Sequence, residues 1–247
     1  SQGAKIGLQL AHAGRKAAQD VAEEIVAPSA IKYSSDYSQP KAMSESDIEK
    51  VISDFKNSAS LALQAGFEVI ELHMAHGYLL HQCLSPISNQ RKDRWGGGLQ
   101  NRFSLPIAVT KAVREVWPLH LPLFVRISAT DWVEGGWDLE QSILLVTELK
   151  KYNVDLIDCS SGGLSPMQKI TVGPGYQVPF SHAIKQQAQV MTGAVGMITD
   201  AKQANQILLE KKADVVFLAR ELLRQPHWPL VAAEVLCVST WWPKQYE

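Results

Sequence analysis

The sequence predicts an α/β fold, a parallel sheet covered by helices, as a single domain over residues 1–247. Three observations support this prediction. Short, β-branched apolar runs recur six times, and most are apolar on both faces, as the strands of a buried parallel sheet are. Helical patterns separate these runs. No linker, low-complexity tract or internal repeat divides the chain.

The predicted strands are apolar runs bounded by polar or turn-forming residues. They cover residues 5–12, 67–73, 123–128, 154–161, 188–195 and 214–220. Two connections are long, residues 12–43 and residues 73–101, and long loops in compact domains are usually functional. Both follow the carboxyl end of a predicted strand, which is the face that carries the active site in a (β/α) barrel. We therefore expect the chemistry in these two loops.

Three helices have clear start signals. Ser44 and Asp47 form a capping pair ahead of apolar residues at helical spacing, and Gly66 follows as a stop. Asp138 and Asp200 are the predicted N-caps of the other two helices. Those two helices are expected over residues 139–152 and 201–212.

Composition excludes several classes of protein. The formal net charge is -1, so no overall field attracts nucleic acid or acidic membranes, and neither is expected as a partner. No apolar run reaches the roughly 18 residues of a membrane span. Cys83, Cys159 and Cys237 are far apart and show neither zinc spacing nor a disulfide framework. A reducing compartment, the cytoplasm, is therefore expected.

The segment IELHMAHGYLLHQ, residues 70–82, places several histidines at a predicted strand end. One interpretation is ordinary polar packing at the rim of the fold. A second is a zinc site of His73, His76 and His81, which is disfavoured because no carboxylate or cysteine stands at ligand spacing and the helical H-E-x-x-H geometry is missing. The third is a hydrogen-bonding pair. His73 and His76 can aim ring nitrogens at one substrate carbonyl oxygen, and Tyr78 can donate a proton.

These residues resemble the active-site segment of the Old Yellow Enzyme family of flavin-dependent ene-reductases. The segments HMAHGY and LLHQCLSPISNQRKDRWGGGLQNR carry the resemblance, which is nearest to the thermophilic-type bacterial branch. Further segments stand in the family order along nearly the whole chain: KIGLQLAHAGRKA, APSAI, LFVRISATD, VDLIDCSSGG, GPGYQVPF, MTGAVGMITD and LARELLRQP.

The resemblance implies an FMN site at the carboxyl ends of the strands. Gln9 matches the residue on the pyrimidine edge of the flavin, and Arg126 matches the arginine near flavin N1 and O2. Gly196, Ala219 and Arg220 match the segments that hold the FMN phosphate, although the family usually has glycine at the position of Ala219.

Three of these residues also have simpler explanations. Gln9 can cap a strand end, and Arg220 can be a solvated surface charge. Arg126 can form an ion pair with Asp131 or Glu71, because buried arginines usually have an acidic partner.

The resemblance also implies an activity. NADPH or NADH reduces FMN, and the flavin then reduces the C=C bond of an α,β-unsaturated carbonyl compound, an enone or enal. His73 and His76 hold the carbonyl oxygen, Tyr78 donates the proton, and no metal is required. The alternative is a truncated, non-redox relative that uses the same His pair as an isomerase or cyclase, or acts as a binding protein.

Family members begin with two β/α units ahead of the segment that opens this chain. The resemblance therefore implies a TIM (β/α)8-type barrel that is incomplete, with six of its eight units. The strands at residues 5–10 and 214–219 then become sheet edges, and bare apolar edges invite association. We expect a homo-oligomer or a partner chain that covers these edges.

Overall fold

The computed structural model describes residues 3–18, 20 and 24–240. Its centre is a six-stranded parallel sheet in the order β1-β4-β5-β6-β7-β8. The strands are β1 (Gly7–Leu10), β4 (Val69–Met74), β5 (Leu123–Ser128), β6 (Leu156–Ser160), β7 (Met191–Ala194) and β8 (Val215–Val216). Neighbours in the sheet are also neighbours in the chain order of these strands, as in successive β/α units. This confirms the six predicted units, and within the described residues β1 and β8 are the edges.

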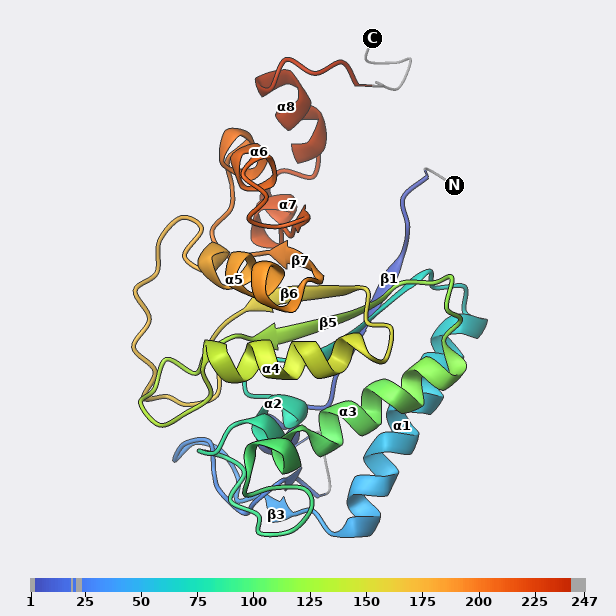
Figure 1. Ribbon diagram of the computed structural model, residues 1–247, viewed down its shortest axis with the longest axis vertical. Coiled ribbons are helices and arrows are strands. Elements are labelled where there is room, and N and C mark those ends of the chain that lie inside the picture. Colours follow the sequence, from blue (N-terminus) through green and yellow to red (C-terminus); the bar gives the residue numbers. More distant parts are fainter. Residues whose placement is uncertain (1–2, 19, 21–23, 241–247) are drawn as a thin grey trace.

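The helices lie outside this sheet, and α1, α3, α4 and α5 pack against one another in chain order (Figure 1). Their bounds are α1 (Glu45–Gln64), α2 (Leu79–Leu84), α3 (Leu99–Val116), α4 (Leu139–Lys150), α5 (Val178–Ala188), α6 (Ala201–Leu209), α7 (Arg220–Arg224) and α8 (Trp228–Val235). Among the described helices, none is long and apolar enough to cross a membrane.

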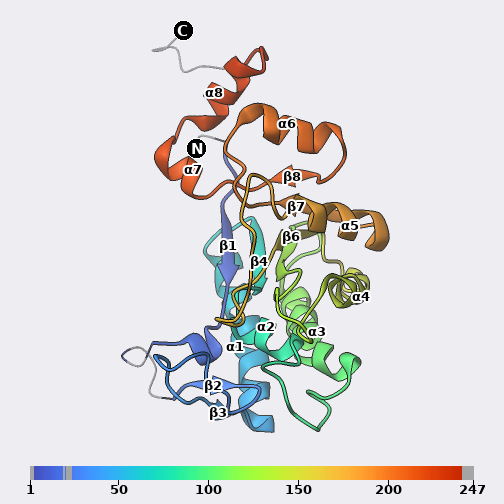
Figure 2. The ribbon, with the colours of Figure 1, turned by 90° about the vertical axis from the view of Figure 1, so that its left-hand side faces the viewer.

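The loop after β1 contains a short 3-10 helix, η1 (Gly14–Lys16), and a strand β2 (Val26–Ala27), which pairs with β3 (Lys41–Ala42). Figure 2 shows β2 and β3 at the opposite end of the molecule from α7 and α8.

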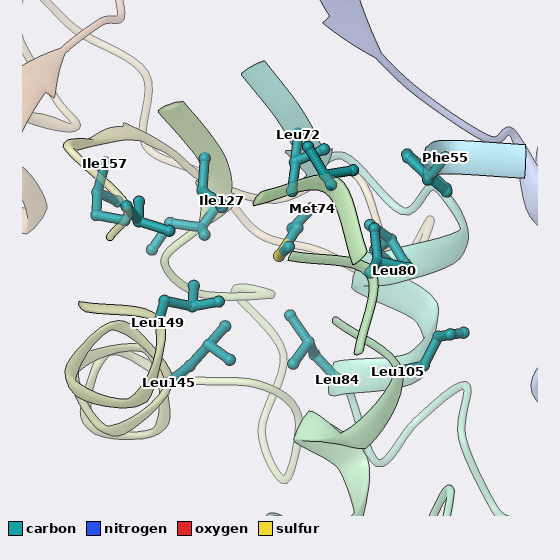
Figure 3. Packing of buried hydrophobic residues seen from close by; sticks show 14 of the residues in the cluster. Phe55, Leu72, Met74, Leu80, Leu84, Leu105, Ile127, Leu145, Leu149 and Ile157 are labelled. Atoms are coloured by element: carbon teal, nitrogen blue, oxygen red, sulfur yellow. The ribbon is translucent and has the colours of Figure 1, made fainter. Parts of the chain in front are cut away.

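The main core lies between one face of the sheet and the helices. Leu72, Val125 and Ile157 are paired in register across β4, β5 and β6, so their side chains share that face. All three are fully buried. They belong to the same hydrophobic cluster as Leu145 and Leu149 of α4, as Figure 3 shows in part. Because strand residues alternate between faces, Glu71, Arg126 and Asp158 project from the other face.

The predicted helix starts are confirmed. Ser44 and Asp47 form a reciprocal capping box, and α1 ends before Gly66, which takes a left-handed φ of 85°. Asp138 and Asp200 each accept a hydrogen bond from a backbone N–H in the first turn of their helix.

Several predicted boundaries are wrong, for identifiable reasons. The helix expected to Lys212 ends at Leu209, because Lys211 adopts a left-handed φ of 55°. The expected strand at residues 188–195 starts only at Met191, because α5 continues to Ala188. The expected strand at residues 214–220 is only Val215–Val216, and α7 begins at Arg220. The predicted loop at residues 73–101 contains α2 and the start of α3.

Candidate active site

One face of the sheet carries a row of polar and charged side chains. Gln9 is in register with Glu71, and Arg126 is in register with both His73 and Asp158. Gln9 Nε2 donates to Glu71 Oε1 at 2.7 Å. Arg126 Nε lies 3.2 Å from Asp158 Oδ2. The acidic partner of Arg126 is therefore neither Asp131 nor Glu71, the two that the sequence suggested, because strand register places Asp158 beside it.

The two carboxyl groups of this row resist ionisation. Burial raises the pKa of Asp158 to about 7; the Arg126 charge opposes this effect, and the Glu71 charge adds to it. Burial also raises the pKa of Glu71, against the hydrogen bond from Gln9 and the charge of Arg126. Asp158 is consequently only partly ionised near neutral pH, so this carboxyl group only partly offsets the charge of Arg126. This fixed positive charge suits an electron-rich group at this face of the sheet.

The histidines stand at the end of β4, where the chain turns into α2. His76 and Gly77 both adopt left-handed backbone conformations, with φ values of 57° and 72°, and Tyr78 is the N-cap of α2. The turn brings three rings together. The His73 ring centroid lies 5.0 Å from that of His76 and 5.1 Å from that of Tyr78. The three residues predicted to contact one substrate are thus adjacent in the structure.

Both imidazoles of this group are neutral at neutral pH. Burial, and then the Arg126 charge, lower the pKa of His73 to about 4 and that of His76 to about 3. His76 Nε2 lies 2.6 Å from Ser160 Oγ. His73 Nδ1, by contrast, is buried without a hydrogen-bond partner among the described residues. An unpaired buried nitrogen carries an energetic cost, which a ligand oxygen can relieve by accepting its N–H.

His81 has a structural role that the sequence did not reveal. Its Nδ1 accepts the Gly77 N–H at 3.0 Å, and its Nε2 lies 2.9 Å from Asp131 Oδ1. Asp131 also accepts from Ser85 Oγ at 2.7 Å. Burial opposes ionisation of Asp131, but His81 and these hydrogen bonds outweigh it and lower the pKa of the carboxyl group. The zinc interpretation required His81 beside His73, whereas both ring nitrogens of His81 face protein groups.

Within the described residues, no three His, Cys, Asp or Glu side chains are arranged to hold a metal ion. His81 and Asp131 are separated by 50 positions, a distance that no local motif spans. The sequence signal available for this support was a histidine among apolar residues shortly after a strand end.

A pocket of about 340 Å³ lies where β7 and β8 end. Gly196, Ala219 and Arg220, the residues expected at the FMN phosphate, all line it. Gly196 has a φ of 116°, and a Cβ there would lie 2.7 Å from Gln177 Nε2, so this position requires glycine. The φ of Ala219, -113°, is not in the left-handed region that favours glycine.

Arg220 is exposed, and its side chain makes no ion pair or hydrogen bond within the described chain. A free guanidinium in the same pocket as Gly196 provides donors that a phosphate monoester requires. The pocket therefore fits the phosphate end of FMN. The other predicted flavin residues, Gln9 and Arg126, form a separate group on the sheet face.

Comparison with known proteins extends these observations. The profile of the NADH:flavin oxidoreductase / NADH oxidase family matches residues 1–237. The chain is 51% identical over 245 residues to the NADPH dehydrogenase of Geobacillus sp. (strain WCH70), and the match covers 99% of this chain and 71% of that protein.

Two of the solved structures that are similar to this chain illustrate the match. One is 2-naphthoyl-CoA reductase in complex with 2-naphthoyl-CoA, with a TM-score of 0.88 and 25% identity. The match covers 94% of this chain and only 38% of that one. The other is morphinone reductase, with a TM-score of 0.78 and 26% identity, covering 99% of this chain and 69% of that one.

Proposed function

Because the chain belongs to the NADH:flavin oxidoreductase / NADH oxidase family, we propose that it is an FMN-dependent NADPH dehydrogenase that reduces the C=C bond of α,β-unsaturated carbonyl compounds. The observation that carries this proposal is the convergence of His73, near the end of β4, with His76 and Tyr78 of the turn that follows. The name of the Geobacillus relative supports NADPH as the reductant.

Gln9 and Arg126 would hold the flavin ring, and Gly196, Ala219 and Arg220 would hold its phosphate. FMN, when bound, accepts hydride from the nicotinamide and delivers it to the substrate. The remaining chemistry belongs to the protein, because the chain itself must bind the carbonyl group and supply the proton.

The substrate carbonyl oxygen accepts a hydrogen bond from His73, whose Nδ1 has no other partner in the described residues. His76 stands beside it, and both rings are neutral, so each is restricted to one N–H donor. These donors stabilise the negative charge that develops on the oxygen when hydride reaches the β-carbon. Tyr78 O–H then donates its proton to the α-carbon.

The test is Tyr78→Phe in the FMN-loaded protein. We expect flavin reduction by NADPH to stay near the wild-type rate and reoxidation by 2-cyclohexenone to slow by about 10²–10⁴-fold, the usual contribution of a general acid. Tyr152→Phe is the matched control, since Tyr152 lies just after α4 and has no side-chain partner within the described chain. Equal reoxidation rates for all three proteins would remove Tyr78 from the mechanism. Failure to bind any flavin would instead favour a non-redox function.

The proposal also covers the domain organisation of the protein, its compartment and its partners. Residues 1–247 are proposed to act as one flavin-binding domain in the cytoplasm, and Cys83, Cys159 and Cys237 are free thiols, as is usual in a reducing compartment. The edge strands β1 and β8 are proposed to be covered by a second copy of the chain or by a partner chain. Ile6, next to β1, is 56% exposed, which is consistent with a partner at that edge.

A further inference from the structure

Two consecutive basic residues at the end of η1, Arg15 and Lys16, reach into the active-site loops. Lys16 Nζ donates to the His76 carbonyl oxygen at 2.9 Å and to the Gly163 carbonyl oxygen at 2.7 Å. Arg15 Nη2 donates to the carbonyl oxygen of the next residue, Leu164, at 2.8 Å. The loop after β1 therefore donates hydrogen bonds to two adjacent carbonyl groups of the loop after β6. Of the two basic residues, Lys16 alone also donates to the turn after β4.

The two turns that Lys16 joins are in direct backbone contact. Gly77 and Gly163 both have left-handed φ values, 72° and 89°. A Cβ on Gly77 would lie 2.2 Å from the Gly163 carbonyl oxygen, and one on Gly163 would lie 2.6 Å from His76 Cα. At this separation the carbonyl groups of His76 and Gly163 point at one shared donor. Their negative ends would repel each other without a positive charge between them.

The surroundings of Lys16 direct its charge to those carbonyls. Its Nζ lies 4.3 Å from the centroid of the Tyr33 ring and 5.7 Å from that of Tyr78. Within the described chain it forms no ion pair with a carboxylate. Burial, and then the Arg15 charge, lower the pKa of Lys16 to about 8. An ammonium group held without a counterion gives strong, charge-assisted hydrogen bonds to its acceptors.

We propose that Lys16 is a positioning residue of this site. Its ammonium group holds the His76–Tyr78 turn against the loop after β6, an arrangement that we call the lock, and so fixes the positions of His76 and Tyr78. The inference rests on the proposed function for the roles of His76 and Tyr78, whereas the lock itself depends only on the contacts above. Arg15 bonds to Leu164 but not to the His76 turn, so it stabilises the loop after β6 without joining the two turns.

The experiment is hydrogen exchange of backbone amides in the protein without substrate, for wild type, Lys16→Met, Lys16→Arg and Lys32→Met. Methionine keeps the length of the stem and removes the donors. Lys32 is exposed and lies in the same loop, so its substitution is the matched control. The reporters are the amides of Gly77, bonded to His81, and of Gly163, bonded to Gln168. Amides of α4 report global stability.

In Lys16→Met we expect exchange at Gly77 and Gly163 to quicken by roughly 10-fold to 100-fold, the value of one charge-assisted hydrogen bond. Exchange in α4 stays at the wild-type rate, Lys16→Arg restores most of the protection, and Lys32→Met has no effect. Unchanged exchange at Gly77 and Gly163 would overturn the proposal. Equal acceleration in α4 would also overturn it, because Lys16 would then only stabilise the whole fold.

A second readout separates this inference from the proposed function. In the FMN-loaded protein, Lys16→Met should lower kcat/KM for 2-cyclohexenone while Lys32→Met leaves it unchanged. If wild type does not reduce the enone but the exchange difference is present, the lock stands and the proposed activity fails. If the enone is reduced equally by wild type and Lys16→Met, the lock has no bearing on the position of the reacting groups and the proposal fails.

Discussion

The backbone contact between the two active-site turns can be tested with a pair of glycine substitutions. Gly77 and Gly135 have nearly the same φ, 72° and 71°, but different surroundings. A Cβ on Gly77 would lie 2.2 Å from the Gly163 carbonyl oxygen, whereas a Cβ on Gly135 would have no atom within 4 Å. Substituting each by alanine therefore changes the backbone strain equally and the steric overlap only at Gly77.

The expected free energies follow from these two terms. An alanine in the left-handed region costs about 1–2 kcal/mol, and the stiffer unfolded chain returns about 0.4–1 kcal/mol. Gly135→Ala should thus lower the free energy of unfolding by about 1 kcal/mol. Gly77→Ala carries the same strain and must also displace backbone atoms, which adds about 1–3 kcal/mol of overpacking.

Urea unfolding followed by far-UV circular dichroism measures both values. Equal losses of stability in the two variants would refute the contact between the turns, and with it the account of why residue 77 is glycine. A larger loss in Gly77→Ala, together with weaker binding of a phenol in the active site, would show that the contact also positions the reacting groups.

Three further predictions concern the flavin face and the sheet edges. Burial raises the pKa of Asp158 to about 7, so its contribution to stability is present at low pH and lost as the pH rises through 7. In urea unfolding, the free energy of unfolding of Asp158→Asn minus that of wild type should therefore rise by about 2–3 kcal/mol between about pH 5 and pH 8. A difference that does not depend on pH would contradict this. Arg220→Gln should weaken FMN binding by about 10-fold to 100-fold, the value of one charge-assisted hydrogen bond. Binding of riboflavin, which lacks the phosphate, should stay unchanged. Titrations that show equal losses of affinity for both ligands would place Arg220 away from the phosphate. Sedimentation should find a species larger than the 27.3 kDa chain because β1 and β8 are edges, and a stable monomer at micromolar concentration would show that these edges need no partner.

Local signals in the sequence predicted some elements well. The capping pair of Ser44 and Asp47, and the N-caps Asp138 and Asp200, locate helix starts because the cap and the backbone N–H that donates to it lie within one turn. The helix α2 was missed because all six of its residues are buried, which erases the apolar periodicity of a surface helix. The short β8 was overestimated because the apolar run continues past the point where pairing with β7 stops.

The candidate site likewise has features that could be predicted from the sequence and features that could not. The adjacency of His73, His76 and Tyr78 could be predicted because all three lie in one short segment, at the end of β4 and in the turn after it. The pairing of Arg126 with Asp158 could not, since it depends on the register of two strands separated by a helix. His81 entered the sequence analysis only in the disfavoured zinc interpretation, and only the fold reveals its contact with Asp131.

The conformation of the His76 turn is imposed by the fold rather than by its own sequence. A histidine at a φ of 57° is locally unfavourable, and such residues persist where the surrounding structure over-determines them. Here every backbone N–H and C=O of His76 and Gly77 is bonded to a side chain from outside the turn. These side chains are those of Ser128 and Lys16 for His76, and of His81 and Gln82 for Gly77. They belong to β5, η1 and α2, so the positions of the His76 and Tyr78 rings depend on three elements outside the turn. Substitutions at these supporting positions should consequently alter catalysis with little change in the side chains that contact the substrate.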